Sequence, residues 1–123
     1  MGCDIHFTVE RRHEGQWVHQ PTDLEISRNY RLFSILAGVR GTETPIAPPR
    51  GIPADAAPET LAAIGDPHDF DNCCMGPFSW LTFTEIIQHP WDYDDSWFPT
   101  KLLLSSVPMI PFDELRLVFW FDS

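Results

Sequence analysis

Histidine and aspartate residues near the two ends of the chain have the types and spacing of a shared polar site. Asp4 and His6 alternate with apolar residues at the start of the sequence, and Asp122 follows a similar alternation at its end. If these end segments are antiparallel neighbours in one sheet, the three side chains share the face opposite the apolar one. An imidazole with two carboxylates suits either a divalent metal ion or a histidine held by an acid for proton transfer. The simpler alternatives are a solvated face, or a His6 that pairs only with Glu10 or Asp122.

A second group of such residues lies between Asp66 and Asp71, where three aspartates and one histidine occupy a loop bounded by turn formers. Hard oxygen ligands at alternating positions can wrap a cation. The pattern of a calcium loop is incomplete, because the glycine and glutamate that it requires are missing, so a solvated acidic loop is the alternative. A divalent metal ion is the one cofactor that the sequence suggests. If the two groups converge, the predicted metal ligands are Asp4, His6, Asp122, His68 and Asp71.

Arginine supplies seven of the eight basic residues, and Arg28, Arg31, Arg40 and Arg50 fall within 23 positions. A guanidinium group matches a phosphate or carboxylate bidentately, so this cluster predicts a site for a small phosphorylated ligand, with Arg31 and Arg50 as its phosphate ligands. The alternative is that these arginines pair with carboxylates of the protein itself.

The charge of the chain restricts its partners. The formal net charge is −10, and residues 51–100 hold nine acidic residues and no Lys or Arg. This balance argues against direct binding of nucleic acid or of an anionic membrane, and favours a basic partner. Aromatic and acidic side chains alternate near the end of this stretch and predict a protein-binding surface. Its predicted residues are Trp91, Asp92, Tyr93, Asp94, Asp95 and Trp97.

Short-range patterns predict strands at both ends. Apolar and polar residues alternate from Ile5 to Glu10 before a turn, which predicts a β-hairpin over residues 4–20. In the last segment, Leu115, Leu117, Phe119 and Phe121 share one face and predict a strand. The proline-rich stretch of residues 39–58 is predicted to be an ordered loop, and residues 91–99 show no clear period.

Helices are predicted between these strands. The apolar run of residues 30–37 predicts a buried helix, with Ser27 or Asn29 as its N-cap and Gly38 just past its end. Residues 58–64 predict a short helix that begins at a proline. The sequence of residues 82–85 fits a capping box, so a helix should follow to about residue 89.

Together these elements predict a single α+β domain over residues 1–123, in which a small antiparallel sheet of the N-terminal hairpin and the C-terminal strand is covered by two or three short helices. Long loops are expected because twelve residues are proline. The three cysteines lack zinc-site spacing, and Cys73 and Cys74 have no cationic neighbour to stabilise a thiolate. No signal peptide or membrane span is evident, so the expected location is the cytoplasm.

Several segments resemble a family of small uncharacterised bacteriophage and prophage proteins. They are the opening Met1–His6, Arg28–Phe33 with Ala37–Arg40, Pro48–Pro53, Ser79–Thr82 and Val118–Asp122. The family has no established activity, so the resemblance implies only a phage context and action in the cytoplasm of a bacterial host. Residues 66–78 depart from the family, because a stretch rich in His and Ser is expected before Ser79.

Two classes of function follow. The first hypothesis is a phage accessory protein without catalytic activity, which inhibits a bacterial defence component by binding a basic or nucleic-acid-handling protein through its acidic, aromatic surface. The alternative is a metal-dependent hydrolase of a phosphoester or nucleotide, with the His and Asp groups on the metal and the arginines on the phosphate. A third hypothesis is a sponge that sequesters a nucleotide without cleaving it. No residue is assigned a catalytic role.

Overall fold

The computed structural model describes residues 2–65, 76–105 and 109–122. The strands are β1 (Asp4–His13), β2 (Gln16–His19), β3 (Phe78–Thr82) and β4 (Leu115–Asp122). The helices are α1 (Tyr30–Ala37), α2 (Pro58–Ile64), α3 (Phe83–Gln88) and α4 (Trp97–Ser105), with short 3-10 turns at Tyr93–Asp95 and Phe112–Glu114. The predicted α+β class is confirmed. Within the described ranges, no helix combines the length and apolar character needed to cross a bilayer.

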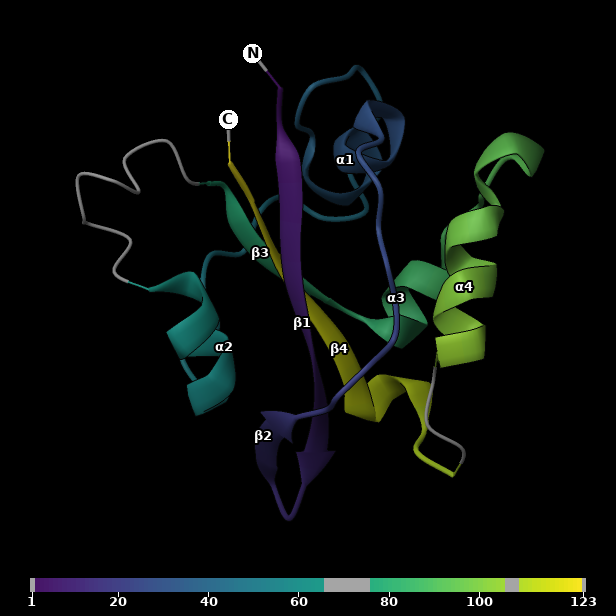
Figure 1. Cartoon of the computed structure of the whole chain (residues 1–123). Coiled ribbons are helices and arrows are strands. Elements are labelled where there is room, and N and C mark those ends of the chain that lie inside the picture. Colours follow the sequence, from purple (N-terminus) through teal and green to yellow (C-terminus); the bar gives the residue numbers. More distant parts are fainter. Residues whose placement is uncertain (1, 66–75, 106–108, 123) are drawn as a thin grey trace.

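The strands form one antiparallel sheet in the order β2-β1-β4-β3. The predicted hairpin is confirmed, and its turn is made by Glu14 and Gly15, whose φ angles of 51° and 78° are the left-handed values that a two-residue hairpin turn needs. The predicted C-terminal strand is also confirmed. It pairs with β1 from Asp4 to Arg11, so both ends of the chain lie at the same end of the sheet (Figure 1).

The core lies on the face of the sheet against which α1, α3 and α4 pack (Figure 1). The apolar alternation of the two end strands supplies this face, since Ile5 and Phe7 of β1 lie opposite Phe121 and Phe119 of β4. The helices contribute large side chains that are almost fully buried: Leu32, Phe33, Leu36, Phe83, Ile86, Phe98 and Leu102. Each such burial stabilises the fold by about 1.5–3 kcal/mol.

Two helices begin where the capping signals predict. The Asn29 side chain accepts a hydrogen bond from the backbone N–H of Leu32 at 3.0 Å, and Gly38 ends α1 with a φ of 74°. In α3 the Thr82 hydroxyl accepts from the N–H of Glu85, and the Glu85 carboxylate accepts from the N–H of Thr82. The predicted helices are therefore confirmed, including α2, which begins at its proline.

The sequence patterns do not predict β3 and α4. β3 is a short strand in which buried Ser79 and Leu81 alternate with partly buried neighbours. α4 is apolar on most sides and has Pro99 in its first turn, so the segment that leads into it shows no clear helical period.

The second face of the sheet is covered where α2 packs on it, on the side opposite the other helices (Figure 1). The Thr8 and Thr60 hydroxyls lie 2.7 Å apart there, and both residues are buried. The prediction that this face could be merely solvated is wrong for the part beneath α2. Asp4 and His6 lie nearer the end of the sheet and are exposed.

Candidate functional site

The residues predicted to meet at the chain ends do meet. Asp4 is the cross-strand partner of Asp122, and His6 is the partner of Trp120. The His6 Nε2 atom lies 2.6 Å from the Asp122 Oδ2 atom, which is the simpler His6 pairing that the sequence left open. This hydrogen bond, together with the positive charge available on His6, lowers the pKa of Asp122 below its ordinary value.

Asp4 does not join this pair, because it binds Arg28. The Arg28 Nε and Nη2 atoms each lie 2.9 Å from Asp4 Oδ1, and the contact raises the pKa of Arg28. Gly2 makes room for it, since a Cβ atom there would lie 2.2 Å from a guanidinium nitrogen. Next to it, the Tyr30 hydroxyl accepts a hydrogen bond from the N–H of Cys3 at 3.1 Å. The opening segment is thus anchored to the chain just before and at the start of α1.

The described residues at the chain ends do not by themselves form a metal site. Two like-charged carboxylates face each other across β1 and β4, and each has its own side-chain partner: Arg28 for Asp4 and His6 for Asp122. Among the described residues no group of three or more His, Cys, Asp or Glu side chains is arranged to hold a metal. The predicted ligands His68 and Asp71 lie outside the described residues.

Arg50, predicted to bind phosphate, is engaged by the protein itself. Its guanidinium group binds both carboxylate oxygens of Glu85, at 2.9 and 2.5 Å, and lies 4.5 Å from the centre of the Trp80 ring. The hydrogen bond from Arg50 lowers the pKa of Glu85 to about 2, with further contributions from Thr82. A phosphate at this position would have to displace the Glu85 carboxylate.

The Glu85 pairing predicts a defined acid sensitivity. A carboxyl group whose pKa is lower in the folded than in the unfolded state stabilises the fold above the unfolded pKa, here about 4.5, and loses this effect as the pH falls to about 2. We expect Glu85→Gln to lower the free energy of unfolding at pH 7 by about 1–2 kcal/mol, allowing for solvent screening of a partly exposed pair. The difference from the unsubstituted protein should disappear between pH 4.5 and 2 in urea titrations. Glu59→Gln, an exposed change on α2, is the control; if it shows the same pH dependence, the pairing is not its cause.

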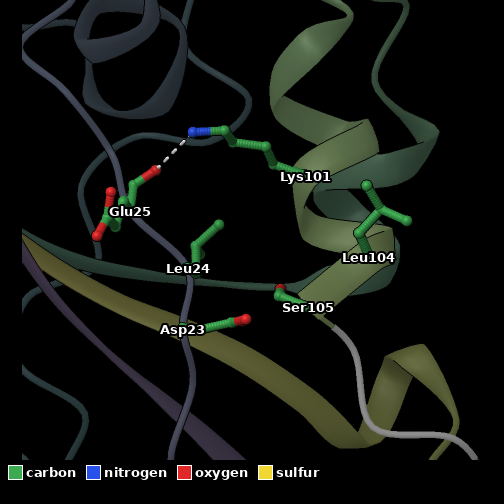
Figure 2. Close-up of a pocket in the computed structure, with 6 residues that line it drawn as sticks. All are labelled: Asp23, Leu24, Glu25, Lys101, Leu104 and Ser105. Atoms are coloured by element: carbon green, nitrogen blue, oxygen red, sulfur yellow. Dashed lines mark hydrogen bonds between the residues drawn. The ribbon is translucent and has the colours of Figure 1, made fainter.

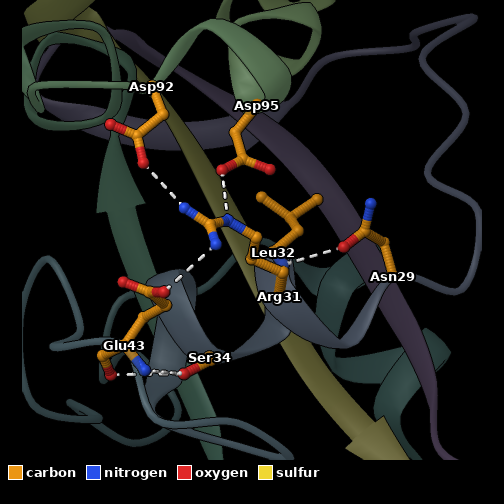
Figure 3. A network of polar contacts seen from close by, with 7 residues as sticks. All are labelled: Asn29, Arg31, Leu32, Ser34, Glu43, Asp92 and Asp95. Atoms are coloured by element: carbon orange, nitrogen blue, oxygen red, sulfur yellow. Dashed lines mark hydrogen bonds and ion pairs between the residues drawn. The ribbon is translucent and has the colours of Figure 1, made fainter.

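Arg31, the other predicted phosphate ligand, is surrounded by three carboxylates (Figure 3). Its Nε atom lies 2.5 Å from Asp95, and its Nη atoms lie 2.7 Å from Asp92 and 3.4 Å from Glu43. The Asp95 hydrogen bond is the main reason that the pKa of Arg31 is raised. The alternative reading of the arginine cluster, pairing with the protein's own acids, therefore describes both Arg31 and Arg50.

The predicted protein-binding segment divides into an inner and an outer part. On the inner side, Asp95 is buried, and the Trp91 indole donates to the backbone carbonyl of Ile86 at 2.7 Å. Trp97 is partly buried and lies 5.8 Å from the Lys101 ammonium. On the outer side, Tyr93 is 93% exposed, between the exposed side chains of Asp92 and Asp94. These three outer residues are called the acidic-aromatic surface below.

A buried ion pair on the second face was not predicted from the sequence. The Glu10 carboxylate accepts hydrogen bonds from Arg116 Nε at 2.7 Å, the Ala57 N–H at 2.8 Å and the Thr60 hydroxyl at 2.6 Å. Glu10 and Arg116 are almost fully buried, and Trp17 lies 4.2 Å from the guanidinium carbon. Because the two charges are buried and bind each other and neighbouring protein groups, we assign this cluster to stability.

A shallow pocket of about 200 Å³ lies between α4 and the segment that joins β2 to α1 (Figure 2). Its walls include Asp23 and Glu25 from that segment and Lys101 and Leu104 from α4. The Lys101 ammonium donates a hydrogen bond to the backbone carbonyl of Glu25 at 3.4 Å. This contact links the middle of the joining segment to α4.

Comparisons with known proteins give no match to a protein-family model, to a curated protein or to a solved structure. Function is therefore inferred from the contacts of the described residues.

Proposed function

We propose that this protein binds a basic protein partner through the acidic-aromatic surface. The observation that carries this proposal is the exposure of Tyr93, at 93%, between two exposed carboxylates on a short 3-10 turn. Tyrosine is a frequent anchor of binding energy at protein interfaces, because its ring buries a large area at a small cost in conformational entropy. Neighbouring carboxylates steer a positively charged partner toward such an anchor.

The turn that presents this surface is held from its inner side. Arg31 binds Asp95 and Asp92, and the Trp91 ring packs against the Phe98 ring of α4 at 5.8 Å. A turn held in this way presents Tyr93 with little conformational freedom to lose on binding, which favours affinity.

We further propose that the partner is a basic or nucleic-acid-handling component of a bacterial defence system, which the protein inhibits in a phage context. The net charge of −10 supports a partner whose own surface is positive. An acidic surface can occupy a groove that otherwise holds nucleic acid, and inhibition would follow by competition. Within the described residues, no contact favours the hydrolase or the nucleotide sponge, because Asp4, His6 and Asp122 are not arranged to hold a metal and Arg31 and Arg50 have carboxylate partners.

Binding through this surface predicts a selective loss of affinity. In binding titrations with a basic protein captured from bacterial lysate, we expect Tyr93→Ala combined with Asp94→Asn to weaken binding by tenfold or more, about the effect of losing one interface anchor. The dependence of affinity on salt should also become shallower, because one carboxylate is removed. Asp113→Asn, an exposed change in the other 3-10 turn, is the matched control and should alter affinity less than twofold.

Competition by nucleic acid provides the second arm of this experiment. Double-stranded DNA should displace the protein from its partner if both occupy one groove. The proposal is abandoned if the captured proteins are not basic, or if the Tyr93 and Asp94 changes leave their binding unaltered.

A further inference from the structure

One half of β1 has a neighbouring strand on only one side. β4 pairs with β1 from Asp4 to Arg11, whereas β2 pairs with it only from Glu10 to His13. The stretch of β1 before Glu10 therefore forms an edge of the sheet, and edges present unpaired backbone groups that can pair with another chain.

The backbone groups on this edge can be identified from their neighbours. The Val9 carbonyl accepts a hydrogen bond from the N–H of Gln20 at 2.8 Å, and the N–H of Cys3 donates to the Tyr30 hydroxyl, both on the side away from β4. Because backbone groups of alternate residues in a strand point to the same side, the N–H and C=O groups of Ile5 and Phe7 also point there. Among the described residues, these groups have no hydrogen-bond partner on that side.

At the opposite edge of the sheet, formed by β3, outward carbonyl groups have hydrogen-bond partners, whereas those of Ile5 and Phe7 have none within the described part of the chain. On β3 the Phe78 carbonyl accepts from the N–H of Gly51 at 2.8 Å, and the Trp80 carbonyl accepts from the Arg50 side chain at 3.1 Å. The segment that joins β2 to α1 does not cover the edge of β1 in the same way. Glu25, in the middle of this segment, contacts Lys101 of α4 instead (Figure 2). Ile5 and Phe7 are accordingly only partly buried.

We propose that the open edge of β1 at Ile5 and Phe7 binds an extended, basic segment of a partner protein by adding it as a further strand. This inference rests on the proposed function, because it names how the basic partner is held. A second copy of the chain fits poorly, since it brings a net charge of −10 to a surface of the same sign. The carboxylates of Asp23 and Glu25 are exposed on the segment that joins β2 to α1, and they complement lysine or arginine side chains.

Helix α1 contacts both the strand that carries the open edge and the turn that carries the acidic-aromatic surface. Tyr30 closes the edge at Cys3, and the following residue, Arg31, binds Asp92 and Asp95. A partner that contacts both surfaces would take backbone hydrogen bonds from β1 and charge complementarity from the acidic turn.

Amide hydrogen exchange with a synthetic peptide of alternating lysine and valine tests this proposal directly. In the free protein, the amides of Ile5 and Phe7 should exchange faster than those of His6 and Thr8, which face β4. Saturating peptide should slow the first pair about tenfold or more, and a peptide of alternating glutamate and valine should not. If the Ile5 and Phe7 amides are already as protected as their neighbours, or if the lysine peptide binds without slowing them, the proposal is wrong.

Ile5→Pro and Ile5→Ala form a matched pair for the same peptide. Both shorten the side chain's contact with the core, but only proline removes the outward N–H and places its ring at the edge, where a strand tolerates it. We expect Ile5→Pro to weaken peptide binding about tenfold relative to Ile5→Ala, with folding of both checked by circular dichroism. The exchange measurement on the unsubstituted protein decides the matter if the proline variant does not fold.

The outcomes separate this inference from the proposed function. If the peptide still protects the edge amides in Tyr93→Ala while partner binding is lost, the proposed roles of both surfaces are supported. Partner binding that depends on Tyr93 but leaves the edge amides unprotected overturns the edge proposal and retains the function. Edge protection that increases with protein concentration in the absence of peptide identifies a second copy as the occupant and also overturns the proposal.

Discussion

Replacing Arg116 with methionine is expected to destabilise the protein by about 3–5 kcal/mol, the cost typical of leaving a buried ion without its partner. Arg116 is 2% exposed, and its guanidinium group binds the Glu10 carboxylate, which is fully buried. Without Arg116, the hydrogen bonds that Glu10 keeps from the described part of the chain are those from Ala57 and Thr60 beneath α2. Because domains of this size are stable by about 5–15 kcal/mol, urea titration should show a much lower midpoint.

Glu10→Gln should cost less than Arg116→Met. Arg116 would keep a hydrogen bond to Asp55 at 3.1 Å, and Asp55 is partly open to solvent, so the remaining charge is not isolated. The double variant Glu10→Gln with Arg116→Met should be more stable than Arg116→Met alone, since it contains no buried charge at this position. Additive losses in this double-mutant cycle would contradict the assignment of a coupled, buried pair.

Local signals predicted most of the elements correctly because their physical causes act over a few residues. The Asn29 cap, the Gly38 end and the Thr82 capping box satisfy backbone groups of the first or last helical turn, so they can be recognised in a short window. The hairpin turn at Glu14 and Gly15 is equally local. By contrast, β3 has five residues and pairs with β4, which lies more than thirty positions away in the chain. Its apolar pattern is too short to predict a strand without knowledge of that pairing.

The cluster around Glu10 shows what the sequence could have indicated. The predicted pairing of the end strands places Asp4 opposite Asp122, and the same register places Glu10 opposite Arg116. An acid and a base opposite each other on the less apolar face were therefore deducible from that pairing. The burial of this pair could not be deduced from the sequence, because it depends on how α2 packs onto the sheet, and no local pattern predicts that packing.

What the predicted site residues can bind depends on which side chains of the same protein they contact, and composition does not specify these contacts. Arg31 and Arg50 have the group required for phosphate, but the folded chain supplies carboxylates to both. His6 and Asp122 meet as predicted, whereas Asp4 binds Arg28. Spacing in the sequence predicted which side chains share an end of the sheet, but the choice among several available partners is made by tertiary packing.

Arg31→Gln is expected to lower the melting temperature by about 5 °C and to weaken partner binding as well. The substitution removes one positive charge from among three carboxylates, and it leaves the Asp95 side chain, which is 8% exposed, without its cation. Repulsion among Glu43, Asp92 and Asp95 then favours opening of the turn that carries Tyr93. Differential scanning calorimetry at pH 7 and low salt, followed by the binding titration used for Tyr93, measures the two effects.

Arg28→Gln is the matched control, because Arg28 is a similarly exposed arginine that binds the single exposed carboxylate of Asp4. It should lower the melting temperature less and leave partner binding unchanged. The deficit of Arg31→Gln should shrink in high salt, which screens the repulsion among the three carboxylates. Equal and salt-independent effects of the two substitutions would mean that Arg31 does not organise the acidic turn, and the presentation of Tyr93 would then need another explanation.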